Sequence, residues 1–124
     1  MCIHEILLVE DNFVLNLEIR ESLEAFDYMI ESVYCSAAAL EALNRRQYLS
    51  GLVTDIELGP APDGFGVACR ARELYPDLPV IFISGNGAAQ HRAHGVAGSL
   101  FIAKPFHPHQ IVAALEQLIQ REAA

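Results

Sequence analysis

The stretch "LVTDIELG", residues 52–59, is an apolar run that carries an aspartate, Asp55, near its end. Gly59 then opens a segment of glycine, proline and aspartate. An apolar run followed by turn-forming residues predicts a strand buried on both faces, as in a parallel sheet. A charge at the end of such a strand contributes nothing to the core, so Asp55 indicates a function at the edge of the sheet.

Outward from this strand, short β-rich runs alternate with longer runs of helical periodicity, and no repeat or low-complexity linker interrupts them. This order is typical of βαβ units and predicts one α/β domain over residues 1–124, with helices on both faces of a parallel sheet. The expected strands are 3–9, 28–34, 51–56, 80–84 and 100–103, and the expected helices are 13–26, 36–46, 65–75, 88–94 and 107–121.

Cap signals and apolar spacing describe these helices further. Asp11 or Asn12 is the expected cap of the first helix, and Ser36 is the expected cap of the second. The helix at 88–94 is expected to be weak and mobile, because glycine is frequent around it. The apolar stripe expected on the first helix consists of Leu15, Ile19, Leu23 and Phe26.

The chain has 124 residues, of which 52% are hydrophobic, enough for one compact domain. Its 16 acidic and 8 basic residues give a formal net charge of -8, which repels nucleic acids and anionic membranes. No apolar run approaches the ~20 residues of a membrane span, and the N-terminus lacks a secretion signal. The three cysteines are scattered, which suits a reducing compartment. We therefore expect a cytoplasmic protein that binds neither nucleic acid nor membrane.

Polar side chains gather at the predicted carboxyl ends of four strands. Because these ends meet at one edge of a parallel sheet, where ligands bind, they are expected to form a site. Three of the side chains are carboxylates, and a pair about 5 Å apart repels by about 3 kcal/mol at an effective dielectric constant of about 20. Mg²⁺, which prefers oxygen ligands, and a lysine would neutralise them. The residues are Glu10, Asp11, Asp55, Ser84 and Lys104.

Each of these residues also has an ordinary structural interpretation. Glu10 and Asp11 suit a solvated helix N-terminus, where acids are favoured. Asp55 or Ser84 could cap a turn. Lys104 could lie on the surface. These alternatives stay open for each residue alone, and the coincidence of all five at one edge favours a site.

The same residues carry a resemblance to a known family. The chain resembles the receiver domain of two-component response regulators over essentially its whole length. The resemblance implies a flavodoxin-like (βα)5 doubly wound sandwich, with a five-stranded parallel sheet in the order 2-1-3-4-5 and helices on both faces. The loop after the third strand is one residue longer than the commoner family form. The matching residues are Glu10, Asp11, Asp55, Asp63, Gly64, Ser84, Phe101, Lys104, Pro105 and Phe106.

The resemblance also implies a role for each site residue. Asp55 would be the phosphoacceptor, and Ser84 and Lys104 would bind the phosphoryl oxygens. A carboxylate attacks phosphorus readily only where charge on the transferred group is cancelled, which explains the mixture of acids and a lysine. The implied Mg²⁺ ligands are Glu10, Asp11, Asp55 and the backbone carbonyl of Glu57.

A switch is implied beside the phosphoacceptor. Ser84 would move towards the phosphoryl group, and Phe101 would then turn inward and change the surface. The bond between Lys104 and Pro105 would be cis, which would aim the lysine into the site.

The implied function is that of a stand-alone bacterial receiver, a phosphoacceptor signalling protein rather than an enzyme. A histidine kinase or histidine phosphotransfer protein would donate the phosphoryl group, whose lifetime Glu57 and Asn86 would modulate. A changed surface of the fourth helix, fifth strand and fifth helix would contact an unidentified protein target. A monomer and a weak homodimer through that surface both stay open.

Three other functions share this topology or chemistry. A receiver-like interaction module that does not use phosphorylation is the main alternative, but the full set of Asp11, Asp55, Ser84 and Lys104 argues against it. A flavodoxin-type cofactor carrier would need a glycine- and serine-rich phosphate loop after the first strand, where this chain has Glu10 and Asp11. An aspartyl phosphatase would carry its two acids after the first strand rather than the third.

Overall fold

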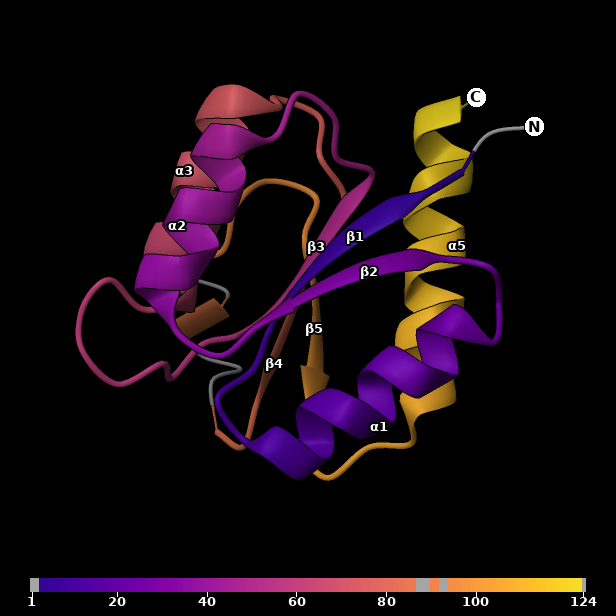
Figure 1. Cartoon of the computed structure of the whole chain (residues 1–124), viewed down its shortest axis with the longest axis horizontal. Coiled ribbons are helices and arrows are strands. Elements are labelled where there is room, and N and C mark those ends of the chain that lie inside the picture. The colour runs from indigo at the N-terminus through magenta and orange to yellow at the C-terminus, as the bar shows by residue number, and fades with distance from the viewer. Residues whose placement is uncertain (1–2, 87–89, 92–93, 124) are drawn as a thin grey trace.

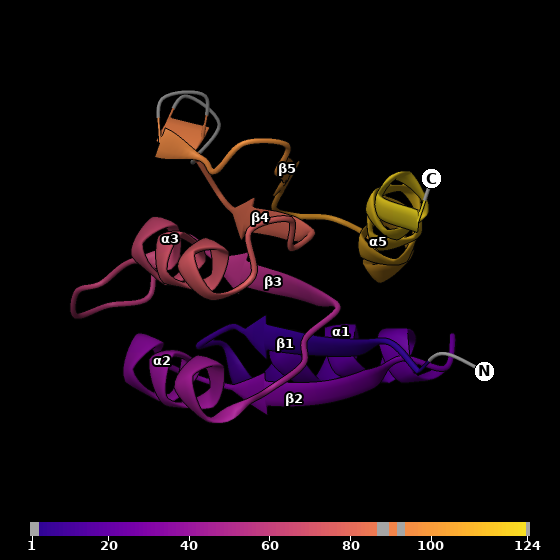
Figure 2. The ribbon, with the colours of Figure 1, turned by 90° about the horizontal axis from the view of Figure 1, so that it is seen from above.

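A computed structural model describes residues 3–86, 90–91 and 94–123. Five parallel strands form one sheet in the order β2-β1-β3-β4-β5, and helices cover both of its faces (Figures 1 and 2). Seen from above, α2 and α3 lie on one face and α1 and α5 on the other (Figure 2). The predicted fold class and strand order are therefore confirmed. The strands are β1 Glu5–Val9, β2 Met29–Val33, β3 Gly51–Asp55, β4 Val80–Ser84 and β5 Leu100–Ala103, and the helices are α1 Phe13–Glu24, α2 Ser36–Arg45, α3 Gly64–Leu74 and α5 Pro108–Ala123.

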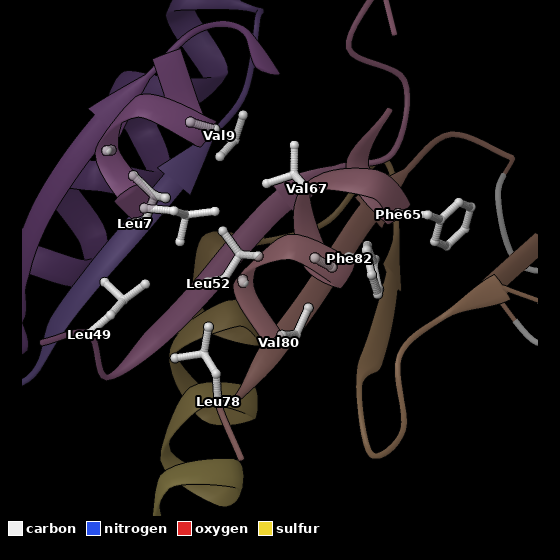
Figure 3. Packing of buried hydrophobic residues seen from close by; sticks show 14 of the residues in the cluster. Leu7, Val9, Leu49, Leu52, Phe65, Val67, Leu78, Val80 and Phe82 are labelled. Carbon is white, nitrogen blue, oxygen red and sulfur yellow. The ribbon is translucent and has the colours of Figure 1, made fainter. Parts of the chain in front are cut away.

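The three central strands are apolar on both sides because each side faces a different core. Successive side chains of a strand point to opposite faces, so Leu7 and Leu8 belong to separate clusters. The cluster towards α2 and α3 contains Leu52 and Phe82 (Figure 3). The cluster towards α1 and α5 contains Ile81. Two covered faces explain why these runs read as continuous rather than alternating.

The first helix is shorter than its apolar pattern predicted. It ends at Glu24, and Ile19 and Leu23 are fully buried as expected. Phe26 was expected on the same stripe, but it is 49% exposed. The reason is that Phe26 follows the end of the helix, and the chain then turns at Asp27, whose φ of 68° is left-handed.

The caps of the helices divide between predicted and unpredicted residues. Asn12 caps α1 as expected, its side chain accepting a hydrogen bond from the backbone of Leu15. Ser36 was expected to cap α2, and this is wrong. Ser36 is the first helical residue, Cys35 occupies the cap position, and the Ser36 hydroxyl donates to the backbone carbonyl of Pro60 over 3.4 Å.

The helix expected at 88–94 can be followed only in part. Residues 90, 91 and 94 are helical, and the rest of that segment lies outside the described residues, so its length and mobility stay predictions. The other four expected helices are present, and both ends of each lie within the described residues. None of the helices within the described ranges combines the length and apolarity that a bilayer crossing needs.

Candidate functional site

The predicted site residues meet at the carboxyl end of the sheet. Asp55 and Ser84 are the last residues of β3 and β4, and Lys104 directly follows β5. A hydrogen bond from the backbone amide of Lys104 to the carbonyl of Ser84 (2.8 Å) fixes the two strand ends together. They border a cavity of about 450 Å³, which is lined by Asp11, Asp55, Glu57, Gly85, Asn86 and Lys104.

Lys104 is the positive centre of this site. Its Nζ lies 3.0 Å from Oδ2 of Asp55 and 3.0 Å from Oε1 of Glu10. The peptide bond between Lys104 and Pro105 is cis. Burial lowers the pKa of Lys104, but its interactions with the carboxylates of Glu10 and Asp55 outweigh burial, so the pKa is raised overall. The ammonium group therefore stays charged at neutral pH.

Glu10 is fully buried, which is rare for a carboxylate. One oxygen, Oε2, accepts a hydrogen bond from the backbone amide of Asn12 over 2.9 Å. The other, Oε1, forms an ion pair with Lys104, and no residue in the described part of the chain gives it a well-aligned hydrogen bond. Burial is the main reason why the pKa of Glu10 is raised to about 7.

Three carboxylates form a cluster suited to a hard cation. Glu10, Asp11 and Asp55 each offer one oxygen, and these oxygens lie within 4.8 Å of one another. Oxygen donors with room for retained waters are what Mg²⁺ requires, and Asp11 is exposed to solvent. Oε1 of buried Glu10 is paired with Lys104 but accepts no well-aligned hydrogen bond from the described residues, which gives a second reason for a cation here. The residues thus fit the metal that the sequence predicted.

The side chain of Asp55 holds the start of the loop that follows it. The backbone amide of Glu57 donates to Oδ1 of Asp55 over 3.1 Å. Asp55 thus accepts one bond from Glu57 and one from Lys104, which fixes the orientation of its carboxylate. Asp63 caps the next helix, α3, and its side chain accepts a hydrogen bond from the amide of Gly66 over 3.0 Å.

A contact between Glu57 and Ser84 was not predicted. The hydroxyl of Ser84 donates to Oε1 of Glu57 over 2.9 Å, linking the ends of β3 and β4. Ser84 is fully buried, whereas Glu57 is exposed. The amide of Asn86 lies 3.4 Å from the same hydroxyl. Sequence alone could not place this contact, because it depends on the path of the loop after Asp55.

Asn16 is a second site-supporting residue that sequence analysis missed. It is 1% exposed, and its Nδ2 donates to the carbonyl of Glu10 (3.0 Å) and to that of Val33 (3.2 Å). These bonds hold the end of β1 against the end of β2. A signal was present, because Asn16 lies three residues before Ile19 on the buried side of α1.

The predicted switch residue Phe101 lies in a row of rings. It is half-buried, and its ring centroid is 5.7 Å from that of His91. His91 is in turn 5.5 Å from Phe82, and Phe82 is 5.0 Å from Phe65. The His91 ring also meets the hydroxyl of Ser99 at 2.8 Å. Movement of Phe101 on phosphorylation stays a prediction.

Comparison with known proteins gives one consistent family. The model of the response regulator receiver domain matches residues 6–116. The response regulator receiver protein CpdR of Brucella abortus is 33% identical over 116 residues, covering 92% of this chain and 95% of that protein.

Solved structures agree with this match. A response regulator receiver protein from Sinorhizobium medicae superposes with a TM-score of 0.92 at 35% identity, over 95% of both chains. The receiver domain of the sensor histidine kinase PA1611 from Pseudomonas aeruginosa has a TM-score of 0.80 at 28% identity, over 96% of this chain and 99% of that one. That structure has a magnesium ion coordinated in its active site cleft.

Proposed function

Because the chain belongs to the family of response regulator receiver domains, we propose that it accepts a phosphoryl group on Asp55 in a Mg²⁺-dependent reaction. The observation that carries the proposal is the setting of Asp55. Its carboxylate lies in a cavity, is paired with Lys104, and shares a cluster of three acids with oxygens within 4.8 Å of one another.

The residues divide the chemistry between them. An oxygen of Asp55 forms a bond to phosphorus while the bond between phosphorus and the donor's leaving group breaks, and that group departs with the electron pair. Glu10, Asp11, Asp55 and the backbone carbonyl of Glu57 would hold Mg²⁺, which would supply positive charge against the phosphoryl oxygens. Lys104 adds a second positive charge, and its bond to Asp55 orients the carboxylate.

The donor that suits this site is a phosphohistidine on a histidine kinase or histidine phosphotransfer protein. Signalling follows through a changed surface around β5 and α5, with Ser84 and Phe101 as the switch. Asn86 and Glu57 line the cavity and are placed to affect how fast water removes the phosphoryl group. We infer a bacterial cytoplasmic signalling protein whose only chemistry is its own phosphorylation and dephosphorylation.

Intact mass after incubation with acetyl phosphate and Mg²⁺ tests the proposal. We expect a single phosphoryl adduct, which is lost in Asp55→Asn and in the presence of EDTA. Asp77→Asn, at an exposed position outside the cavity, should keep the adduct and serves as the matched control. A wild-type protein that forms no adduct and binds no beryllium fluoride would leave an interaction module without phosphorylation.

A further inference from the structure

We propose that Glu57 is a positioning residue that holds the Ser84 hydroxyl in the unphosphorylated protein and competes with the incoming phosphoryl group for it. The inference rests on the proposed function, since it concerns the same site. It assigns a specific task to the Glu57 side chain: its carboxylate stands where a phosphoryl oxygen would otherwise receive the proton of Ser84.

The Ser84 hydroxyl already has an acceptor in the unphosphorylated protein. A serine hydroxyl has one proton to donate, and in this structure that proton goes to Oε1 of Glu57, 2.9 Å away. A carboxylate is a stronger acceptor than a neutral oxygen, so the bond is a charge-assisted one. Ser84 is fully buried, so solvent does not readily take over the bond. The Ser84 hydroxyl therefore already donates its hydrogen bond before any phosphoryl group is present.

Glu57 lies between the proposed phosphoacceptor and the Ser84 hydroxyl. Its backbone amide is fixed to Oδ1 of Asp55 over 3.1 Å, so the side chain starts beside the phosphoacceptor and reaches across to the end of β4. Asp55 and Glu57 both line the cavity of about 450 Å³ in which a phosphoryl group on Asp55 would lie. The carboxylate and the phosphoryl oxygens are thus rival acceptors for one proton.

The difference in exposure between the two partners gives the direction of change. Glu57 is exposed and can turn to solvent without a large loss, whereas Ser84 is enclosed at the strand end. A phosphoryl group that takes the Ser84 proton therefore displaces the glutamate and not the serine. The hydrogen bond between Ser84 and Glu57 must therefore break on phosphorylation, and its free energy favours the unphosphorylated state.

Binding of beryllium fluoride with Mg²⁺, measured by titration calorimetry, is the experiment. Glu57→Ala should bind this phosphoryl mimic about tenfold more tightly than wild type, the scale expected when one competing charge-assisted hydrogen bond is lost. Glu57→Gln keeps an acceptor for Ser84 and should gain less than Glu57→Ala. Glu18→Ala removes the same charge from an exposed position on α1 and should leave the affinity unchanged.

A double-mutant cycle with Ser84→Ala separates the proposal from simple charge repulsion. If Glu57 acts through the Ser84 hydroxyl, Glu57→Ala should give no gain in affinity in the Ser84→Ala background. An undiminished gain there would mean that Glu57 acts on the phosphoryl group by its charge alone, which overturns the inference. Failure of wild type to bind the mimic would instead reject the proposed function.

A ligand-free measurement covers the case in which Ser84→Ala binds too weakly to titrate. The amide of Asn86 lies 3.4 Å from the Ser84 hydroxyl, so its NMR resonance reports where that hydroxyl points. The resonance should move in Glu57→Ala and move less in Glu57→Gln. An unchanged resonance in Glu57→Ala would show that the hydroxyl is not held by Glu57 in solution.

Discussion

Gly64 lies against Asp55 so closely that no side chain fits between them: a Cβ on Gly64 would stand 2.1 Å from the carbonyl oxygen of Asp55. The amide of Gly64 also donates to the carbonyl of Ile56 over 2.8 Å. The start of α3 is therefore packed directly against the backbone at the end of β3.

Gly64→Ala is expected to lower the free energy of unfolding by about 2 kcal/mol, because the added methyl group forces the start of α3 away from Asp55. Urea unfolding measures the change. Gly85→Ala is the matched control, since a Cβ there meets no atom of the described residues within 4 Å, and it should change stability by no more than about 0.5 kcal/mol. Equal effects of the two substitutions would contradict the close packing.

Stability should depend on pH through Glu10. Its pKa is raised from 4.5 to about 7, mainly by burial. Between these values the folded protein binds the proton more tightly than the unfolded chain, so stability falls as the pH rises through that window. In EDTA, the free energy of unfolding of wild type should fall by up to about 3 kcal/mol more than that of Glu10→Gln as the pH rises from 4.5 to about 7. Urea unfolding measures the difference. Parallel pH profiles would show that Glu10 does not titrate there.

Lys104 and a bound cation should oppose each other. The Lys104 ammonium lies 3.0 Å from oxygens of both Glu10 and Asp55, which are also the expected metal ligands. Removal of its charge in Lys104→Gln should therefore tighten Mg²⁺ binding, by about threefold to tenfold at low salt. Calorimetry with MgCl₂ measures this. Arg20→Gln removes a positive charge from an exposed position on α1 and should have no such effect. Weaker binding in Lys104→Gln would mean that the lysine orients the carboxylates more than it repels the ion.

Asn16→Ala should destabilise the protein by about 2 kcal/mol, because it removes both hydrogen bonds that Asn16 donates and leaves the buried carbonyl of Glu10 without its donor. Glu21→Ala, at an exposed position on the same helix, should stay within about 0.5 kcal/mol of wild type. Chemical denaturation compares the two. The Asn16 variant should also bind Mg²⁺ less tightly, since the end of β1 carries two of the expected ligands; unchanged affinity would limit Asn16 to a role in folding.

The strands followed from the sequence because each central strand faces two cores, so its apolar run is long, uninterrupted and bounded by turn residues. Their order was implied by the resemblance to receiver domains. The convergence of Asp55, Ser84 and Lys104 followed from topology, since parallel strands end at one edge.

What sequence analysis missed depends on the exact path of the chain. Phe26 matched the spacing of a buried stripe but lies beyond the last turn of α1. Ser36 had the chemistry of a cap, but α2 begins one residue earlier than that role requires. The bond between Ser84 and Glu57 joins the last residue of β4 to the loop after β3, and no local pattern encodes their separation.

The row of rings formed by Phe65, Phe82, His91 and Phe101 has a mechanical consequence. Each ring packs against the next, with centroid separations of 5.0, 5.5 and 5.7 Å. A ring that leaves its place opens a void beside its neighbour, and voids in a close-packed interior are costly enough to draw surrounding groups inward. A rotation of Phe101 would therefore leave a void beside the His91 ring, and a shift of that ring to fill the void would couple β5 to residue 91, beyond the end of β4.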